Sequence, residues 1–446
     1  NIVNFGRKHK VFMKLILGLG VTGLSVARFF NKNNISFRIA DSRQEPPMLK
    51  ISKNENLLHD FYFGEWNVSL LDDISEIIIS PGIAESELIV RWARKKNISI
   101  ISDIELFGRY VKAPMIGITG SNGKSTVTQL LGEMALASSL KAYICGNIGN
   151  PVMESMNDDA ELYIVELSSY QLDYTNHLDL YAGVITNISP DHLDRYSSYS
   201  DYISSKLSIY NYSKFNIVNL NESEVSEIIG DNLFSIEQSE SRCDFFASEK
   251  DDLYEVFHQD KLLMSSNDIS VVGKHNIENI LAALTLGYRF GLSVDVMKET
   301  VIGFKGLVHR LEFVSTINQV DFYNDSKSTN AISTITAINA LDAKYANLVL
   351  ILGGIAKKED YSELFKLISQ KVKTVILIGE SSSDFCRHID GPRVVVSESM
   401  KEAVEISKEA SESGAVVLSP GCASFDMFDN FNNRGEVFKH HVLEDN

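Results

Sequence analysis

Cysteine and long apolar runs are both scarce in this chain, and each scarcity excludes a class of protein. Only four of the 446 residues are cysteine, and no two of them form a C-x-x-C pair. The sequence therefore predicts neither a zinc site nor a redox motif, and so little cysteine in a long chain is typical of the reducing cytosol. No apolar run approaches the roughly 18 residues that a membrane-spanning helix needs. We therefore expect a cytoplasmic protein without a membrane partner.

Positive charge is also in short supply. The formal net charge is −17 at pH 7, whereas a protein that binds a nucleic-acid backbone needs clustered Lys and Arg. We therefore expect no nucleic-acid partner, although a small anionic ligand would need only a local positive site. The composition, with 44% hydrophobic and 23% charged residues, is that of a globular protein, and the length suffices for about two to four domains. We expect a monomer.

The N-terminal residues have two interpretations. Basic residues precede the apolar Leu15, Ile16 and Leu17 as in a signal peptide, but glycines break the apolar run at once and no A-x-A cleavage site follows. A strand that enters a glycine loop is the better interpretation. Because Met13 looks like a natural start, we expect residues 1–12 to be an extension.

Apolar strands alternate with helical patterns in three segments. Such alternation predicts doubly wound, mostly parallel sheets and hence an α/β fold. We expect an N-terminal Rossmann-like domain over residues 13–102, a central domain over 103–306 and a second Rossmann-like domain over 307–446. Within the central domain, short alternating stretches over about 243–272 predict a small antiparallel ribbon, and residues 276–290 a helix. The predicted strands are 14–17, 37–40, 76–79, 115–119, 162–166, 183–186, 215–219, 322–323, 348–352, 374–378 and 416–419.

A G-x-G-x-x-G motif over residues 18–23 follows the first predicted strand and opens a helix. Asp41 ends the next strand, about where an acid binds the ribose in dinucleotide folds. Taken alone, this pattern is typical of an NAD site. Bare N–H groups at a helix N-terminus bind any diphosphate, however, and a UDP-sugar carries the same diphosphate and ribose as half of NAD. Glycines needed only for a tight turn are a third alternative.

A second glycine loop, TGSNGKST at residues 119–126, lies between the strand 115–118 and a helix. Its N–H groups suit phosphate oxygens, Lys124 suits the β- and γ-phosphates, and the Ser125 hydroxyl suits Mg²⁺. The strict P-loop pattern requires glycine where this chain has Ile118, so the loop is a shortened P-loop. A Gly-Lys turn without a ligand does not account for the strand–loop–helix context. The predicted ATP-binding residues of this loop are Gly120, Ser121, Asn122, Gly123, Lys124, Ser125 and Thr126.

The shortened loop resembles the ATP loop of the Mur ligases and the folylpolyglutamate synthases. Other Mur ligase motifs occur in the same order: GNIG at 146–149, ELSSYQL at 166–172, NISPDHLD at 187–194, HN at 275–276, HR at 309–310 and NDSKSTN at 324–330. The ELSSYQL segment, and CASFD at 422–426, are similar to the branch of the family that adds D-glutamate. The resemblance covers about residues 13 to 440. It implies three domains, the central one a P-loop ATPase domain, and an ATP-dependent amide ligase of peptidoglycan synthesis that joins D-glutamate to UDP-N-acetylmuramoyl-L-alanine.

The implied chemistry explains why these residue types occur. A carboxylate must become an acyl phosphate, by attack on the ATP γ-phosphate, before an amine can displace phosphate from it. That step brings two anions together and requires positive charge at the transferring phosphoryl group. Mg²⁺ prefers oxygen ligands; Ser125 is one candidate, and Glu166 at the end of a predicted strand is another, although an acid there often caps a helix.

Two further metal ligands rest on the resemblance. It implies that His192 joins Glu166 at a second Mg²⁺, where a loop histidine by itself would indicate nothing. Spacing alone makes Lys206 a solvated lysine on a helix over residues 201–212. The resemblance implies instead a carbamylated Lys206, whose carboxylate-like group would bind the second of two Mg²⁺ ions.

The resemblance also assigns substrate-binding residues in each domain. A substrate with two carboxylates needs cations, which Lys327 and Lys357 supply. In the loop before Lys357, however, this chain has GGIAK where the family often has GGDGK, so the loop is more apolar and less flexible. The implied catalytic residues are Lys124, His192, Lys206 and Lys327. The implied substrate contacts are Asn279, Arg310 and Asp325 for the nucleotide; Lys327, Thr329, Lys357, Ser424 and Phe431 for D-glutamate; and Gly20, Thr22, Asp41, Ser42, Arg43, Gly82, Asn147 and His192 for the UDP substrate.

Several alternatives stay open at this point. Another Mur ligase, adding L-alanine, a diamino acid or a dipeptide, and a folylpolyglutamate synthase belong to the same class. The first glycine loop disfavours the folate enzyme, which has no UDP domain. An NAD-dependent dehydrogenase with an incidental P-loop belongs to a different class. A nucleotide-binding regulator would not explain loops suited to anions in three separate domains.

Overall fold

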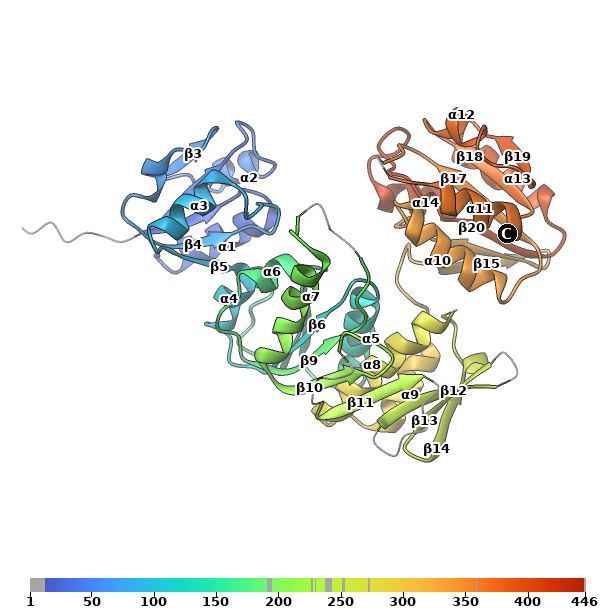
Figure 1. Cartoon of the computed structure of the whole chain (residues 1–446), viewed down its shortest axis with the longest axis horizontal. Helices are drawn as coiled ribbons and strands as arrows, with labels where there is room; N and C mark the ends of the chain where they lie inside the picture. Colours follow the sequence, from blue (N-terminus) through green and yellow to red (C-terminus); the bar gives the residue numbers. More distant parts are fainter. Residues whose placement is uncertain are drawn as a thin grey trace, which may run out of the picture. The chain divides into compact units, whose positions relative to one another are not determined.

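The computed structural model describes residues 13–190, 195–225, 228, 230–236, 243–250, 253–271, 273–357 and 359–444 of the chain. These residues form three β-sheets combined with helices, and most strand pairs are parallel (Figure 1). The predicted fold class, an α/β protein of three domains, is confirmed. One compact unit contains the first sheet and most of the second, and the other contains the third. Residues 1–12, the expected extension, lie outside the described residues.

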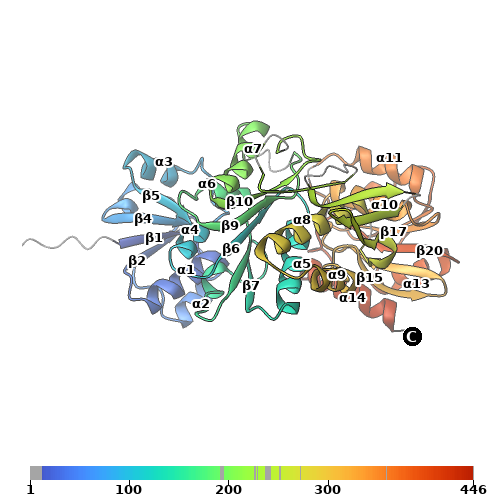
Figure 2. The ribbon, with the colours of Figure 1, turned by 90° about the horizontal axis from the view of Figure 1, so that it is seen from below.

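The N-terminal sheet carries the first glycine loop at its centre. Its five strands lie in the order β3-β2-β1-β4-β5, and all neighbours are parallel; Figure 2 shows β4, β1 and β2 side by side. The direction of winding reverses between β1 and β4, so the loop after β1 lies at the switch point where such sheets bind ligands. The LIL of β1 and the III of β4 are buried, as expected for parallel strands covered on both faces. The elements are β1 (Met13–Leu17), α1 (Val21–Lys32), β2 (Phe37–Asp41), α2 (Leu49–Asn54), β3 (Phe61–Phe63), η1 (Val68–Leu71), β4 (Ile74–Ile79), α3 (Leu88–Lys95) and β5 (Ser99–Ser102).

The central sheet brings three of the predicted motifs to one edge. Its nine strands lie in the order β14-β13-β12-β11-β10-β9-β6-β8-β7. Strand β6 lies between β8 and β9 and is parallel to both, so the segments that follow these three strands meet. The elements are α4 (Asp103–Gly108), β6 (Met115–Thr119), α5 (Lys124–Ala137), β7 (Ala142–Gly146), η2 (Val152–Glu154), β8 (Leu162–Glu166), α6 (Ser169–Asp173), β9 (Leu180–Ile185), α7 (Tyr199–Leu207), η3 (Ser208–Asn211), β10 (Ser213–Asn219), β11 (Asn232–Ile236), β12 (Cys243–Lys250), β13 (Leu253–His258), β14 (Lys261–Ser265), η4 (Ser266–Asp268), α8 (Lys274–Phe290) and α9 (Val294–Gly303).

The helix predicted over residues 201–212 is wrong in its second half. Helix α7 ends at Leu207, and the 3₁₀ helix η3 follows it. The hydroxyl of Ser208 donates a hydrogen bond to the carbonyl of Ser205 (2.7 Å), and such side-chain bonds compete with the α-helical pattern. The residues predicted as a small ribbon form β12, β13 and β14, which continue the central sheet beyond β11.

The C-terminal sheet is a second open α/β unit. Its strands lie in the order β15-β16-β20-β17-β18-β19, and only the β15–β16 pair among them is antiparallel. The central strands β17, β18 and β20 are buried apolar runs. The elements are β15 (Glu312–Ile317), β16 (Val320–Asn324), α10 (Ala331–Asp342), β17 (Leu348–Gly353), α11 (Ser362–Lys371), β18 (Thr374–Ile378), α12 (Ser382–Phe385), β19 (Arg393–Val396), α13 (Met400–Ala410), β20 (Gly414–Leu418) and α14 (Phe431–Leu443).

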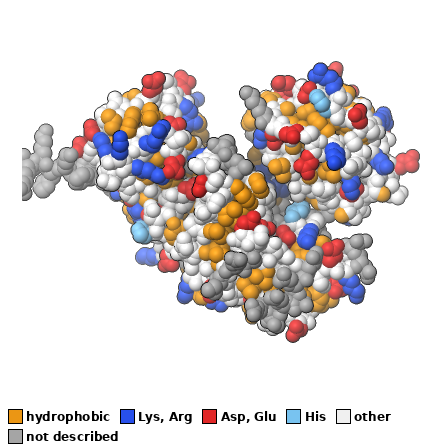
Figure 3. Space-filling model, viewed as in Figure 1, with side chains coloured by type: hydrophobic (Ala, Val, Ile, Leu, Met, Phe, Trp, Pro, Cys, Tyr) orange, Lys and Arg blue, Asp and Glu red, His pale blue; other side chains and the backbone are white. Residues whose placement is uncertain are grey.

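The surface mixes charges of both signs. On the face shown in Figure 3, acidic and basic side chains of the described residues are interspersed with polar and apolar ones. Such mixing is ordinary for a globular protein. None of the described helices combines the length and the apolarity that are needed to span a bilayer.

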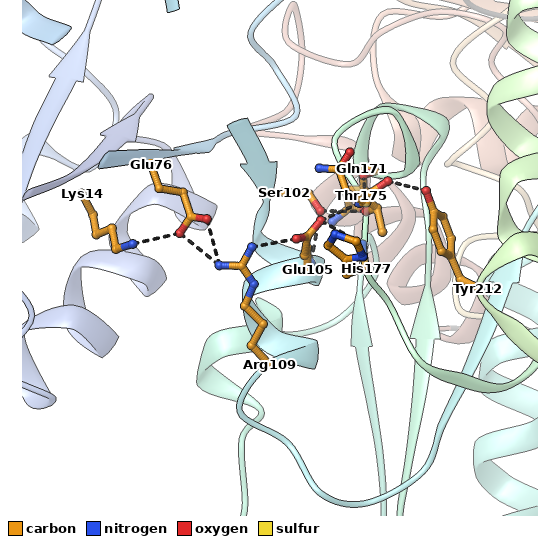
Figure 4. Close-up of polar contacts among 10 residues, drawn as sticks. Lys14, Glu76, Ser102, Glu105, Arg109, Gln171, Thr175, His177 and Tyr212 are labelled. Carbon is orange, nitrogen blue, oxygen red and sulfur yellow. Dashed lines mark hydrogen bonds and ion pairs between the residues drawn. The ribbon is translucent and has the colours of Figure 1, made fainter. Parts of the chain in front are cut away.

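A network of charged side chains joins the first sheet to the central domain (Figure 4). The carboxylate of Glu76, on β4, accepts hydrogen bonds from Lys14 (3.1 Å) and Arg109 (2.9 Å). The other Nη atom of Arg109 donates to Glu105 on α4 (2.7 Å). Glu105 is buried and its second oxygen accepts from the backbone N–H of Asn176. The guanidinium of Arg109 therefore connects carboxylates of two domains.

Replacing Arg109 should loosen this connection. We expect Arg109→Met to lower the free energy of unfolding by about 1 kcal/mol, because solvent screens the ion pairs of a partly exposed arginine. The measurement is urea denaturation, read at the first transition. Lys96→Met is the matched control, since Lys96 pairs with Asp72 and both side chains are exposed. Equal losses in the two variants would contradict a role of Arg109 beyond that of a surface ion pair.

Candidate functional site

The first glycine loop borders a cavity of about 510 Å³. Gly18 has a φ of +94°, and a Cβ on Gly23 would lie 1.9 Å from the carbonyl oxygen of Gly18, so both positions require glycine. No side chain of the described residues caps α1, which leaves backbone N–H groups of its first turn to an anion. Six of the predicted UDP-substrate residues line this cavity: Gly20, Thr22, Asp41, Ser42, Arg43 and Gly82.

Asp41 organises the wall of this cavity. Its carboxylate accepts the backbone N–H of Leu19 (2.8 Å) and both Nε (2.8 Å) and Nη2 (2.7 Å) of Arg43. Burial acts to raise the pKa of Asp41, but the hydrogen bonds from Arg43 and Leu19 outweigh it and leave the pKa below its usual value. The anionic carboxylate thus fixes the position of the Arg43 guanidinium, a cation suited to a phosphate-bearing ligand.

The second glycine loop has the backbone of a phosphate-binding loop. Gly123 has a φ of +80° and directly precedes α5, which no side chain of the described residues caps. A Cβ on Gly123 would lie 2.1 Å from Oδ1 of Asn279, so the predicted nucleotide ligand Asn279 lies beside the loop. The Nζ of Lys124 donates to the carbonyls of Gly120 (2.8 Å) and Ser121 (2.9 Å). The lysine is therefore folded back onto its own loop.

Residues after β9 hold the P-loop in place, a role that their sequence does not indicate. The side chain of Asn187 accepts the N–H of Asn122 (2.9 Å), and its backbone carbonyl accepts the N–H of Ser121 (2.9 Å). The hydroxyl of Ser121 donates to the carbonyl of Ser189 (3.0 Å) and lies 2.8 Å from the hydroxyl of Tyr202. Two residues of the NISPDHLD motif, Asn187 and Ser189, thus support the P-loop. His192 of that motif lies outside the described residues.

Lys206 is buried beside the P-loop, so the solvated lysine that spacing predicted is wrong. Only 2% of the residue is exposed, and its Nζ donates to the carbonyl of Gly120 (2.7 Å). The Nζ also lies 4.7 Å from the centre of the Tyr202 ring. The periodicity of α7 concealed this, because a polar residue within a helix is usually exposed. A cavity of about 250 Å³ adjoins the amine; it is lined by Lys124, Asn147, Ser168, Ser169, Tyr170, Tyr202 and Lys206.

Glu166 has the environment of a metal ligand rather than of a helix cap. The helix that follows, α6, is capped by Ser168 and Gln171 in a capping box, so the helix-cap alternative for Glu166 is wrong. Glu166 is 2% exposed, and its Oε1 accepts the side-chain N–H of Asn147 (2.8 Å). Its Oε2 is buried and has no hydrogen-bond partner among the described residues. A buried carboxylate oxygen with open lone pairs fits a hard cation such as Mg²⁺, and the neighbouring strand β6 leads into the loop that carries Ser125.

Predicted D-glutamate residues meet in the C-terminal domain. The Nζ of Lys327 lies 5.5 Å from the centre of the Phe431 ring, and the Nζ of Lys357 lies 3.4 Å from Oγ1 of Thr329. The GGIAK loop is pinned by a bridge between Ile355 and Ala423, next to Ser424. Lys357 therefore contacts Thr329 even though the GGIAK loop is apolar.

Asp325 lies in the same domain, directly after β16 and two residues before Lys327. It accepts hydrogen bonds from the hydroxyls of Ser328 and Ser419 and from the N–H of Leu311 (3.0 Å). Burial raises its pKa to about 6, although these hydrogen bonds act in the opposite direction. Asp325 and Arg310 belong to the second compact unit, and their contact with the nucleotide stays a prediction.

Arg434, on α14, is the main residue of this site that the sequence analysis missed. It is fully buried, and its guanidinium donates to the hydroxyl (3.0 Å) and carbonyl (2.8 Å) of Ser326 and to the carbonyl of Cys422 (3.1 Å). Burial lowers its pKa to about 10. Ser326 precedes Lys327, and Cys422 is two residues before Ser424. One side chain therefore holds together the segments that carry Lys327 and Ser424.

Comparison with known proteins identifies the family. Residues 13–102 match the model of the Mur ligase MurD-like N-terminal domain, residues 118–287 the Mur ligase middle domain and residues 309–422 the Mur ligase glutamate ligase domain. The UDP-N-acetylmuramoylalanine--D-glutamate ligase of Coxiella burnetii is 39% identical over 434 residues, which cover 96% of this chain and 97% of that protein. Proteins with the same name from Nitrosococcus oceani and Marinobacter nauticus are each 38% identical and cover 96% and 95% of this chain, and 96% of their own length.

This chain belongs to the Mur ligase family.

Solved structures of other Mur ligases share the fold. The UDP-N-acetylmuramate-alanine ligase of Thermotoga maritima has a TM-score of 0.63 at 15% identity, covering 97% of this chain and all of that one. A pseudomurein peptide ligase type C from Methanothermus fervidus has a TM-score of 0.58 at 17% identity, with the same coverage. At these identities the likeness concerns the fold alone. Membership of the Mur ligase family also leaves the NAD interpretation of the first glycine loop without support.

In this Mur ligase, replacing Arg434 should destabilise the C-terminal domain. We expect Arg434→Met to lower the free energy of unfolding by about 2 kcal/mol, because carbonyls of buried loops lose their donors. Arg387→Met is the control, since Arg387 is exposed and pairs only weakly with its neighbour Asp384 on the surface. Urea denaturation followed by circular dichroism measures both. A loss below about 0.5 kcal/mol in Arg434→Met would contradict its holding the loops together.

Proposed function

We propose that this Mur ligase adds D-glutamate to UDP-N-acetylmuramoyl-L-alanine in peptidoglycan synthesis, at the expense of ATP, and releases ADP and phosphate. The observation that carries the proposal is its near full-length similarity to relatives named UDP-N-acetylmuramoylalanine--D-glutamate ligase, at 38–39% identity. A cytoplasmic location and a monomeric state stay predictions from the sequence.

The first step is the transfer of the γ-phosphoryl group from ATP to the alanyl carboxylate. The N–H groups of residues 123–125, at the start of α5, would bind the phosphates, and Lys124 would exchange the carbonyls of Gly120 and Ser121 for phosphate oxygens. A cation at the transferring group offsets the repulsion between the two reacting anions. Asn279, which lies against Gly123, would contact the nucleotide. Asn147 and His192 would lie at the alanyl end of the UDP substrate.

Mg²⁺ fits the residues beside the P-loop. Ser125 would be one ligand, and the open Oε2 of Glu166 would be another. When bound, Mg²⁺ would neutralise charge on the phosphates. His192 and a carbamylated Lys206 would complete a second Mg²⁺ site. The burial of Lys206 supports the carbamate, because an ammonium group in a buried site beside metal ions would be repelled and poorly hydrated.

The second step is attack by the amine of D-glutamate on the acyl phosphate. Lys327 and Lys357 supply the cations that two carboxylates need. Thr329 lies beside Lys357, and Phe431 lies beside Lys327. Ser424 is buried, lies two residues after Cys422, whose carbonyl Arg434 bonds, and offers a hydroxyl. Together these residues would orient the amino acid so that its amine faces the acyl phosphate.

Phosphate release should require all four reactants together. With ATP, Mg²⁺ and UDP-N-acetylmuramoyl-L-alanine present, we expect D-glutamate to give the fastest release among D-glutamate, L-glutamate, L-alanine and a diamino acid. The measurement is a coupled phosphate assay with each amino acid in turn. Faster turnover with any of the other three would refute the assignment of D-glutamate, and a lack of turnover with all of them would refute the ligase.

Lys206 offers a test of the carbamate. Lys206→Gln keeps the stem of the side chain but cannot react with CO₂, and we expect it to lose about 10²-fold or more of the turnover because the second metal loses a ligand. Added acetate should restore part of the activity by supplying a free carboxylate. Lys214→Gln, at an exposed position of β10, is the control. Full activity of Lys206→Gln, or a loss that acetate leaves unchanged while D-glutamate ligation proceeds in the wild type, would overturn the carbamate.

A further inference from the structure

Arg195 contacts residues that line two cavities of the first compact unit. Its Nη1 donates to the carbonyl of Pro81 (2.8 Å) and its Nη2 to the carbonyl of Ile83 (2.8 Å). Both residues line the cavity of about 510 Å³ beside the first glycine loop. The Cζ of Arg195 also lies 3.9 Å from the centre of the Tyr170 ring, and Tyr170 lines the cavity beside the P-loop.

Arg195 bonds a turn at residues 80–83, which forms part of the wall of the cavity of about 510 Å³ (here called the first cavity). The N–H of Ile83 bonds to the carbonyl of Ser80 (3.0 Å), which closes the turn. The hydroxyl of Ser80 donates to the carbonyl of Gly18 (3.1 Å), so the turn is bonded to the glycine loop. Two parallel N–H bonds from a planar guanidinium fix both the distance and the orientation of this turn.

The ring of Tyr170, against which Arg195 lies, belongs to a group of mutually bonded side chains in the central domain. The ring of Tyr170 stacks on that of Tyr196, with centres 6.1 Å apart. The hydroxyl of Tyr196 donates to Asp173 (2.8 Å). The hydroxyl of Ser205, next to Lys206 in sequence, donates to the carbonyl of Ser169 (3.0 Å). The two tyrosine rings beside the guanidinium are thus bonded to α6, and α6 is bonded to α7.

We propose that Arg195 is a positioning residue for the UDP substrate, which acts from the central domain by fixing the turn at residues 80–83. This inference rests on the proposed function, because that function assigns the UDP substrate to the first cavity. A turn held in one place before binding loses less freedom when the ligand arrives, and affinity for that ligand is higher. The hydrogen bonds of Arg195 to the turn at residues 80–83 involve none of the residues proposed for the nucleotide or the amino acid. The apparent affinities of those two substrates should therefore depend on Arg195 much less than that of the UDP substrate.

The experiment separates the three substrates. For Arg195→Met we expect the KM for UDP-N-acetylmuramoyl-L-alanine to rise about tenfold, while the KM values for ATP and D-glutamate stay within about twofold and kcat within about threefold. Arg195→Lys keeps the charge over Tyr170 but cannot donate to two carbonyls in a fixed orientation. Its KM for the UDP substrate should therefore lie between that of the wild type and that of Arg195→Met. Titration calorimetry with UDP alone should show the same order of affinities.

Arg94→Met is the matched control, because Arg94 is an exposed arginine of the N-terminal domain that pairs with Glu85. The proposal is overturned if Arg195→Met leaves the KM for the UDP substrate within twofold of the wild type. It is equally overturned if all three KM values change in parallel and the melting temperature falls, since that pattern indicates a merely structural role. Failure of the proposed function is a different outcome: the wild type itself would then release no phosphate with D-glutamate.

Discussion

The amine of Lys206, buried against the carbonyl of Gly120, is the contact on which the arrangement of the central site depends. Burying an amine that is charged in water costs several kcal/mol unless its surroundings compensate. This lysine nevertheless lies at the P-loop, where the phosphates of ATP are proposed to bind. Helix α7 must pack closely on the loop to bring it there, and Tyr202, one turn earlier, meets Ser121 of the loop. The cost of burial is understandable if the nitrogen serves as the attachment point of an anion that binds a metal ion.

The same constraint explains the neighbours of Lys206. A metal site needs more than one oxygen ligand, and the open Oε2 of Glu166 lies at the end of β8, next to the strand that leads into the P-loop. The residues after β9 fasten the P-loop from its other side through Asn187. Parallel strands with their carboxyl ends at one edge bring these three segments together. In the first and third sheets, too, candidate site residues follow the carboxyl ends of strands: the glycine loop follows β1, and Asp325 follows β16.

Much of this organisation follows from local sequence. Continuous apolar runs predict the buried parallel strands, and the two glycine loops are predictable because phosphate binding needs bare N–H groups and left-handed glycines. The burial of Lys206 is not predictable from spacing, because helix periodicity treats a lysine as a surface residue and contains no information on the loop that α7 packs against. Arg434 and Arg195 are hidden for the same reason, since their partners are backbone carbonyls far away in the sequence. The end of α7 at Leu207 depends on a serine hydroxyl that competes for a carbonyl, which propensity alone does not decide.

Carbon-13 NMR of the protein equilibrated with ¹³C-bicarbonate is the sharpest test of a carbamate on Lys206, because it detects the carbamate without relying on turnover. The buried amine of Lys206 should give a carbamate resonance in the wild type, strengthened by Mg²⁺ and nucleotide, and Lys206→Gln should lack it. A wild-type protein that ligates D-glutamate but shows no such resonance, or a resonance that persists in Lys206→Gln, would contradict the account.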